Sequence, residues 1–139
     1  MTSAPGGPGP YCAVKIVDRV FGWLLVLGGV LHTVGATVGL KDTPGALVWP
    51  LAGSVAAFLV AALNLMRVNR PRDRTLAWVS AGGSIAWLAV ALGFGASVGN
   101  FLDPRGLYHV IVALVLAGLS IRTAVDPSAA QASSAGSFI

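Results

Sequence analysis

Four long apolar stretches, separated by short polar turns, are the feature that most constrains the fold of this chain. Between the second and third stretches lies a basic turn, in which four of the eight positions 67–74 are arginines. About 20 apolar residues in an α-helix are enough to cross a hydrocarbon core of about 30 Å. The apolar stretches therefore predict four transmembrane helices, over residues 17–40, 46–66, 75–98 and 105–124.

The composition agrees with a membrane protein and argues against a soluble domain. Of the 139 residues, 55% are apolar and only 10% are charged, whereas soluble domains carry roughly 25% charged residues. So little charge cannot cover the surface of a small globule in water. The formal net charge of +4 comes without a basic face that carries interleaved aromatic residues, so we expect no nucleic-acid partner.

The apolar stretches suit helices better than membrane strands. In lipid, every backbone N–H and C=O group must be satisfied within the protein, which restricts spans to helices and closed barrels. Barrel strands are about 10 residues long and alternate in polarity, and these stretches do neither. We therefore predict an all-α bundle of four transmembrane helices over residues 14–125, with a disordered Gly/Pro-rich tail over 1–13 and a disordered Ala/Ser-rich tail over 126–139.

The distribution of lysine and arginine predicts the orientation of the bundle in the lipid bilayer. Cytoplasmic turns of membrane proteins carry an excess of these residues, and with four spans seven of them fall on one side and two on the other. We therefore expect a multi-pass protein of the inner or plasma membrane, with both termini and the central turn in the cytoplasm. The seven are Lys15, Arg19, Arg67, Arg70, Arg72, Arg74 and Arg122, and the two are Lys41 and Arg105.

The first apolar stretch has an alternative interpretation as a cleaved signal peptide. Lys15 and Arg19 resemble the charged beginning of such a peptide, and residues 34–36 resemble a cleavage site. The apolar stretch continues past Ala36, however, so we expect the first helix to be retained.

The arginine turn has a second expected property besides setting the topology. We expect Arg67, Arg70, Arg72 and Arg74 to contact anionic lipid headgroups, with about 1 kcal/mol for each basic residue near the surface. The alternative is that the turn docks a cytoplasmic partner protein.

Small residues recur at helical spacing and predict close packing between helices. Glycines four positions apart let two membrane helices approach closely, and an asparagine can hydrogen-bond across the contact. Such faces also favour association with a second copy of the chain or with a larger membrane complex. The residues expected to pack are Gly28, Gly35 and Gly39 in the first helix, Gly53, Ala57, Ala61 and Asn64 in the second, and Gly95 and Gly99 in the third.

Two histidines are the candidate ligand-binding residues. His32 lies roughly 12 Å below the outer end of the first helix, and His109 roughly 6 Å below the same end of the fourth. Two imidazoles at similar depth on neighbouring helices suit the axial ligation of haem b or a hydrogen bond to a quinone. The alternative is that each histidine only hydrogen-bonds a carbonyl group within the bundle.

The sequence does not predict an enzyme. No ionisable residue other than histidine occupies the middle of any predicted span, and the serines have no acidic or basic partner at depth that would activate them. We therefore expect a small non-enzymatic accessory or scaffold subunit without a cofactor or a metal ion. The alternatives are an electron-transfer subunit that binds haem or a quinone through His32 and His109, and a small-solute channel or transporter.

Overall fold

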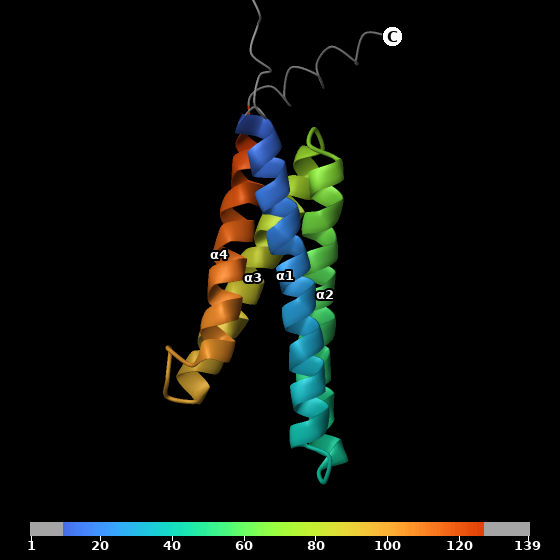
Figure 1. Ribbon diagram of the computed structural model, residues 1–139, viewed down its shortest axis with the longest axis vertical. Helices are drawn as coiled ribbons and strands as arrows, with labels where there is room; N and C mark the ends of the chain where they lie inside the picture. The colour runs from blue at the N-terminus through green and yellow to red at the C-terminus, as the bar shows by residue number, and fades with distance from the viewer. Residues whose placement is uncertain (1–9, 127–139) are drawn as a thin grey trace, which may run out of the picture.

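The chain folds into a bundle of four antiparallel helices (Figure 1). This computed structural model describes residues 10–126. The predicted all-helical bundle is confirmed, and α2, α3 and α4 lie within a few residues of their expected places. The helices are α1 (Pro10–Gly39), α2 (Val48–Asn69), α3 (Arg74–Ser97) and α4 (Pro104–Val125), and a short 3₁₀ helix, η1 (Pro44–Leu47), precedes α2.

The helix α1 begins earlier than the sequence predicts. It starts at Pro10, so residues 10–13, which were expected in the N-terminal tail, are helical. Extending the helix is the favourable way to satisfy their backbone groups, because each added residue contributes one more hydrogen bond. The remaining tail predictions concern residues 1–9 and 127–139, which lie outside the described residues.

The starts of α3 and α4 follow from local capping chemistry. The carboxylate of Asp73 accepts a hydrogen bond of 2.9 Å from the backbone N–H of Leu76, and that of Asp103 accepts one of 3.0 Å from the backbone N–H of Arg105. Such side chains satisfy N–H groups that have no partner within the first helical turn. Pro104 occupies the first position of α4, where its missing N–H costs nothing.

Three helices are long and apolar enough to cross a membrane, namely Gly45–Asn69, Arg74–Ser97 and Pro104–Val125. The surface of the bundle is apolar to match, since large side chains such as Val38 (68% exposed) face outward. The interior combines small apolar residues with several serines, an asparagine, an arginine and an aspartate that are also buried. Buried polar groups within an apolar exterior suit lipid as the solvent, which indicates a membrane protein.

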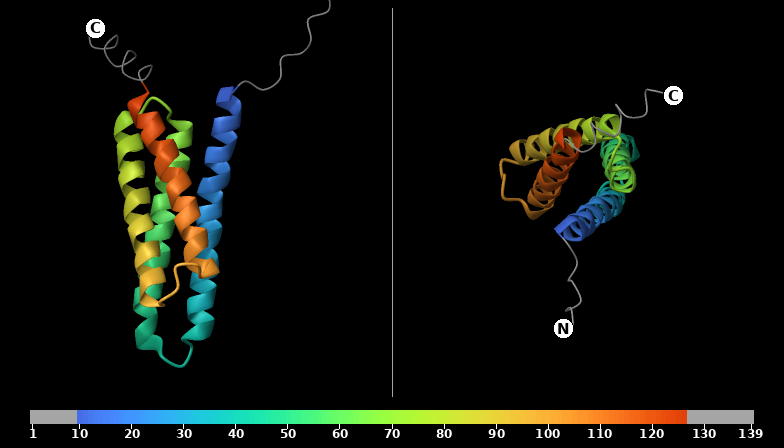
Figure 2. Two further views of the ribbon diagram at one scale, coloured as in Figure 1. Left: turned by 90° about the vertical axis from the view of Figure 1, so that its left-hand side faces the viewer. Right: turned by 90° about the horizontal axis from the view of Figure 1, so that it is seen from above.

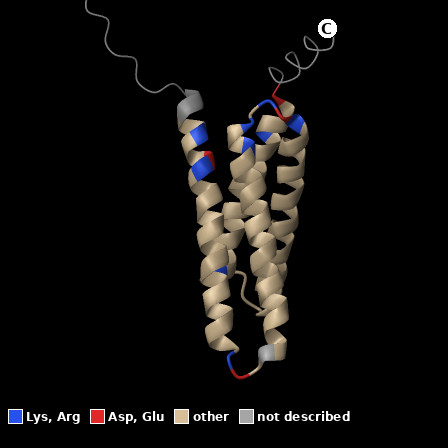
Figure 3. Ribbon diagram, turned by 90° about the vertical axis from the view of Figure 1, so that its right-hand side faces the viewer, with Lys and Arg blue, Asp and Glu red and all other residues tan. Residues whose placement is uncertain are grey.

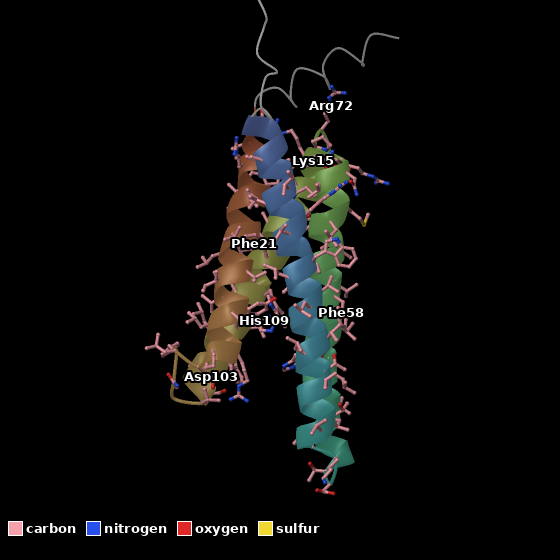
Figure 4. All side chains as sticks on the ribbon, in the orientation of Figure 1. Lys15, Phe21, Phe58, Arg72, Asp103 and His109 are labelled. Atoms are coloured by element: carbon pink, nitrogen blue, oxygen red, sulfur yellow. The ribbon has the colours of Figure 1, made fainter. Side chains whose placement is uncertain are left out.

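The helices form two hairpins, α1–α2 and α3–α4, which are joined by the α2–α3 turn at the end where α1 begins and α4 ends and which diverge toward the other end in the view of Figure 1. In the side view of Figure 2, α4 instead approaches α1 toward that other end. The hairpins also differ in reach. The turn between α3 and α4, where Figure 4 labels Asp103, stops well short of the turn between α1 and α2. The inner faces of α1 and α2 are therefore left uncovered near their common turn.

Two glycines allow the close packing of α1 against α2. A Cβ atom added to Gly22 would lie 2.7 Å from Cδ2 of Leu65, and one added to Gly29 would lie 2.7 Å from Cε1 of Phe58. These two glycines, seven residues apart on one helix face, admit the large side chains of α2. Further along the bundle, an apolar core joins the two hairpins around Leu25 of α1 and Leu116 of α4.

Candidate functional site

A cleft of about 780 Å³ lies between the two hairpins, on the side of the bundle away from the chain ends. All four helices line it, mostly with glycine, alanine and other apolar residues. The polar and aromatic side chains that distinguish it are His32, Trp49, Trp87, Arg105, Tyr108 and His109. The structure thus brings both candidate histidines to the same cleft, one from α1 and one from α4.

His109 is the best-defined polar group of the cleft and is half-buried (Figure 4). The indole Nε1 of Trp87 donates a hydrogen bond of 3.4 Å to its Nδ1. The rings of Trp87 and Tyr108 meet the imidazole edge-on, with centroids 5.4 and 5.3 Å away. Because an indole N–H can only donate, Nδ1 is the acceptor in this hydrogen bond, and a neutral imidazole in this arrangement would carry its proton on Nε2.

Gly28 makes room for His109 on the neighbouring helix. A Cβ atom at this position would lie 2.7 Å from Cε1 of His109 and 2.7 Å from Cε1 of Tyr108. The hydroxyl of Tyr108 also donates a hydrogen bond of 2.6 Å to the carbonyl oxygen of Leu24. Both contacts tie α4 to α1 and fix the side of the cleft on which the imidazole lies.

His32 lines the cleft from α1 and is more exposed than His109. It points toward α2, since a Cβ atom at Gly53 would lie 3.6 Å from its Nε2. Within residues 10–126 its side chain takes part in none of the hydrogen bonds of the bundle. The expected alternative of a carbonyl partner is therefore not found for His32, and its ring is free to meet a ligand.

Arg105 lines the cleft near the turn between α3 and α4 and is paired with Asp103. Its Nη2 lies 2.9 Å from Oδ2 of Asp103, its guanidinium lies 5.5 Å from the centre of the Phe94 ring, and its side chain is 74% exposed. The hydrogen bond from this guanidinium lowers the pKa of Asp103 to about 2. The pair therefore keeps both charges across the physiological pH range.

The glycine pairs expected to pack helices behave differently from that expectation. Within residues 10–126, no atom of a neighbouring element lies within 4 Å of a Cβ position at Gly35 or Gly39, and Gly35 lines the cleft instead. Gly95 packs instead against the following turn, where an added Cβ atom would lie 3.0 Å from Cδ1 of Phe101. Gly99 lies outside α3 with a φ of +67°, where it turns the chain, so its assignment to a helix-packing pair is wrong.

A second polar cluster lies at the opposite end of the bundle, where the chain ends are. Nη2 of Arg67 lies 2.6 Å from Oδ1 of Asp18, and the two side chains are 1% and 7% exposed. The expectation that Arg67 contacts lipid headgroups is therefore wrong for its side chain, which faces inward to meet this carboxylate. Arg70, Arg72 and Arg74 are exposed, so the turn still presents three cationic side chains at this end (Figure 3).

Asn64 extends the cluster through the bundle and links three helices. Its Nδ2 donates to Oγ of Ser84 on α3 at 3.0 Å, and its Oδ1 accepts from Oγ of Ser120 on α4 at 2.9 Å. Arg67 adds a hydrogen bond of 2.9 Å to Oγ1 of Thr123. With Asp18 on α1, the cluster draws a polar side chain from every helix. Ala57 and Ala61 continue the same buried face of α2.

Sequence reasoning missed two residues that shape these sites. Asp18 is the one acidic residue within the four apolar stretches, and a carboxylate in a membrane span calls for a buried cation. The position of Asp18 in the sequence therefore indicates a buried cationic partner, although it does not identify which arginine that partner is. Trp87 carried no such signal, because its role depends on how α3 and α4 pack.

Comparisons with known proteins add no assignment to these sites. No protein-family model, no curated protein and no solved structure matches this chain. Within residues 10–126, no group of three or more His, Cys, Asp or Glu side chains is placed to hold a metal ion. The function of the cleft is therefore inferred from its own side chains.

Proposed function

We propose that this chain is a four-span protein of the cell membrane, with both termini in the cytoplasm, that binds a lipid-soluble ligand in the cleft. In this proposal α1 is the fourth span, because it packs along α2 for most of its length and exposes apolar residues such as Val34 and Val38 on its surface. The excess of lysine and arginine at the end that carries both chain ends supports the orientation (Figure 3).

The ligand class follows from the proton on Nε2 of His109. With its Nδ1 lone pair engaged by Trp87, a neutral imidazole has one N–H donor, on Nε2, and no free lone pair for a ligand. A haem-ligating histidine has the opposite arrangement, with a lone pair on the iron and the other nitrogen donating. A ligand with carbonyl acceptors on an apolar ring, such as a quinone, therefore fits His109 better than haem iron does.

The size and lining of the cleft support the same ligand class. Its volume of about 780 Å³ lies within the range of about 300–1,000 Å³ that is usual for small-molecule sites. Aromatic side chains, among them Trp87 and Tyr108, line it beside aliphatic ones. A flat apolar ring matches such walls, and His32 supplies a second nitrogen from the other hairpin. We propose binding rather than catalysis.

The proposal is tested by titrating the purified protein with decylubiquinone and following tryptophan fluorescence. Saturable quenching is expected, because two tryptophans line the cleft. His109→Phe keeps a ring in place but removes the hydrogen-bond donor. It should weaken binding about tenfold, because one hydrogen bond contributes about 1.5 kcal/mol. Trp23→Phe, at an exposed site outside the cleft, is the control and should bind as the wild type does.

Two outcomes would count against quinone binding. Equal affinities of His109→Phe and the wild type would remove the donor on which the ligand class rests. A Soret band in the purified protein that is lost in His109→Ala would replace the quinone with haem.

An accessory or scaffold role is the second candidate, and Gly39 is the residue that supports it. Gly39 is exposed and no side chain packs over it within the described part of the chain, so a second helix could approach it closely. If it forms such a contact, Gly39→Leu should reduce the oligomeric mass measured by light scattering in detergent. An unchanged mass would count against this role.

A further inference from the structure

A second, smaller cavity lies at the end of the bundle that carries both chain ends, and it has no part in the proposed function. Its volume is about 330 Å³ and it lies among α1, α2 and α4. The side chains that give it its chemistry are Lys15, Asp18, Arg67, Arg122 and Thr123. The large cleft and this cavity share no lining residue.

Arg67 is not fully satisfied by the protein. Its two Nη atoms donate to Asp18, Thr123, Asn64 and a backbone carbonyl. Its Nε is buried and has no hydrogen-bond partner within residues 10–126. A buried donor left without an acceptor costs about 1–3 kcal/mol, so the structure calls for an acceptor oxygen beside this guanidinium.

The charges around the cavity favour an anion as the source of that oxygen. Lys15, Arg67 and Arg122 contribute three positive charges, against two negative charges from Asp18 and Asp126. Lys15 and Arg122 are exposed and approach the cavity from α1 and α4, so they can close on a ligand without unpacking the core. The lining also lies where the apolar helices end, the depth at which lipid headgroups are found.

From the unpartnered Nε of Arg67 and the flanking Lys15 and Arg122, we propose that this cavity binds the phosphate group of an anionic phospholipid. The phosphate oxygens would accept from these basic side chains, as is usual for phosphate recognition by arginine and lysine. Such a lipid would seal the gap between α1 and α4 beside the Asp18–Arg67 pair. A soluble phosphate offers the same oxygens, and the experiment distinguishes the two sources.

The test measures lipid retention by the full chain after extraction from nanodiscs of mixed phosphatidylglycerol and phosphatidylcholine. Native mass spectrometry counts the lipids that remain bound. The double variant Lys15→Gln/Arg122→Gln should bind phosphatidylglycerol about 25-fold more weakly, since each basic side chain near an anionic surface gives about a fivefold effect. Both residues are exposed, so the variant should fold.

The matched control is Arg70→Gln/Arg72→Gln, which removes the same charge from the same end but outside the cavity (Figure 4). Retention of phosphatidylglycerol by the control and its loss by the cavity variant would support the site. Equal losses would overturn it, because general surface charge would then explain the binding. Failure of the wild type to prefer phosphatidylglycerol over phosphatidylcholine would also overturn it.

The NMR chemical shift of the Arg67 Nε nitrogen reports directly on an oxygen bound to this group. The chemical shift should change when phosphatidylglycerol is added to the wild type, and should not change in the Lys15→Gln/Arg122→Gln variant. The same shift with inorganic phosphate alone would support the phosphate site and assign it to a soluble anion. No shift with either probe would contradict the proposal.

Discussion

At the scale of single residues, the buried pair of Arg67 and Asp18 has the largest energetic consequences. Taking two charges out of water is costly, and their attraction repays the cost only when the geometry is good and the remaining groups are hydrogen-bonded. Here the pair lies at 2.6 Å, and the guanidinium has further acceptors on α2 and α4. Either charge alone would be left in a place that cannot solvate it.

Breaking the pair should therefore destabilise the bundle strongly. Arg67→Met or Asp18→Leu alone should lower the free energy of unfolding by about 3–5 kcal/mol, because one buried charge loses its partner. The double variant Asp18→Leu/Arg67→Met should recover most of that loss. The measurement is unfolding of the purified protein by denaturant in detergent.

The exposed Arg72 serves as the control for the loss of an arginine. Arg72→Met should change the free energy of unfolding by less than about 0.5 kcal/mol, as is usual for surface positions. A double variant as unstable as the sum of its two single variants would show that Asp18 and Arg67 do not act as a pair.

At the scale of elements, glycine positions decide how the helices of each hairpin approach. Gly22 and Gly29 contact α2 closely, and Gly28 contacts α4 at His109 and Tyr108. Other helical glycines, such as Gly118, have open space at the Cβ position. The same residue type therefore has opposite consequences at different places on the helices.

Two alanine substitutions should separate these cases. Gly29→Ala should destabilise the bundle by about 1–3 kcal/mol, because the new methyl group overlaps the ring of Phe58. Gly118→Ala has the same helical preference without the overlap and should stabilise it by about 0.5–1 kcal/mol. Thermal unfolding in one detergent compares the two, and equal shifts of the same sign would contradict the role of Gly29.

The elements were largely predictable from the sequence, whereas the contacts between them were not. Apolar length and the turns fix helix bounds locally, which is why α2, α3 and α4 lie close to their expected ranges. The inward turn of Arg67 depends on Asp18, 49 residues away, and no local pattern specifies that partner. Likewise, the open space beside Gly35 in the cleft depends on how the two hairpins lie relative to each other, which no local pattern specifies.

At the scale of the whole molecule, the arrangement of the helices makes a clear prediction about topology. Cys12 is the one cysteine of the chain, and the proposed four spans would place it on the side of the membrane opposite the turn that contains Thr43. If the termini are cytoplasmic, as proposed, a membrane-impermeant maleimide should label Cys12 in inside-out vesicles and leave it unlabelled in intact cells.

The reciprocal variant completes the topology test. Cys12→Ser/Thr43→Cys should be labelled in intact cells, because the proposed orientation places the α1–α2 turn outside the cell. Labelling of both positions from the same side would show that α1 does not cross the membrane.

The two hairpins are joined by hydrogen bonds at two heights of the bundle. Arg67 of α2 donates to Thr123 of α4 near one end, and Tyr108 of α4 donates to Leu24 of α1 beside the cleft. A change in the angle between the hairpins would therefore have to strain or break one of these two bonds. The width of the cleft is thus limited by contacts that the protein makes with itself.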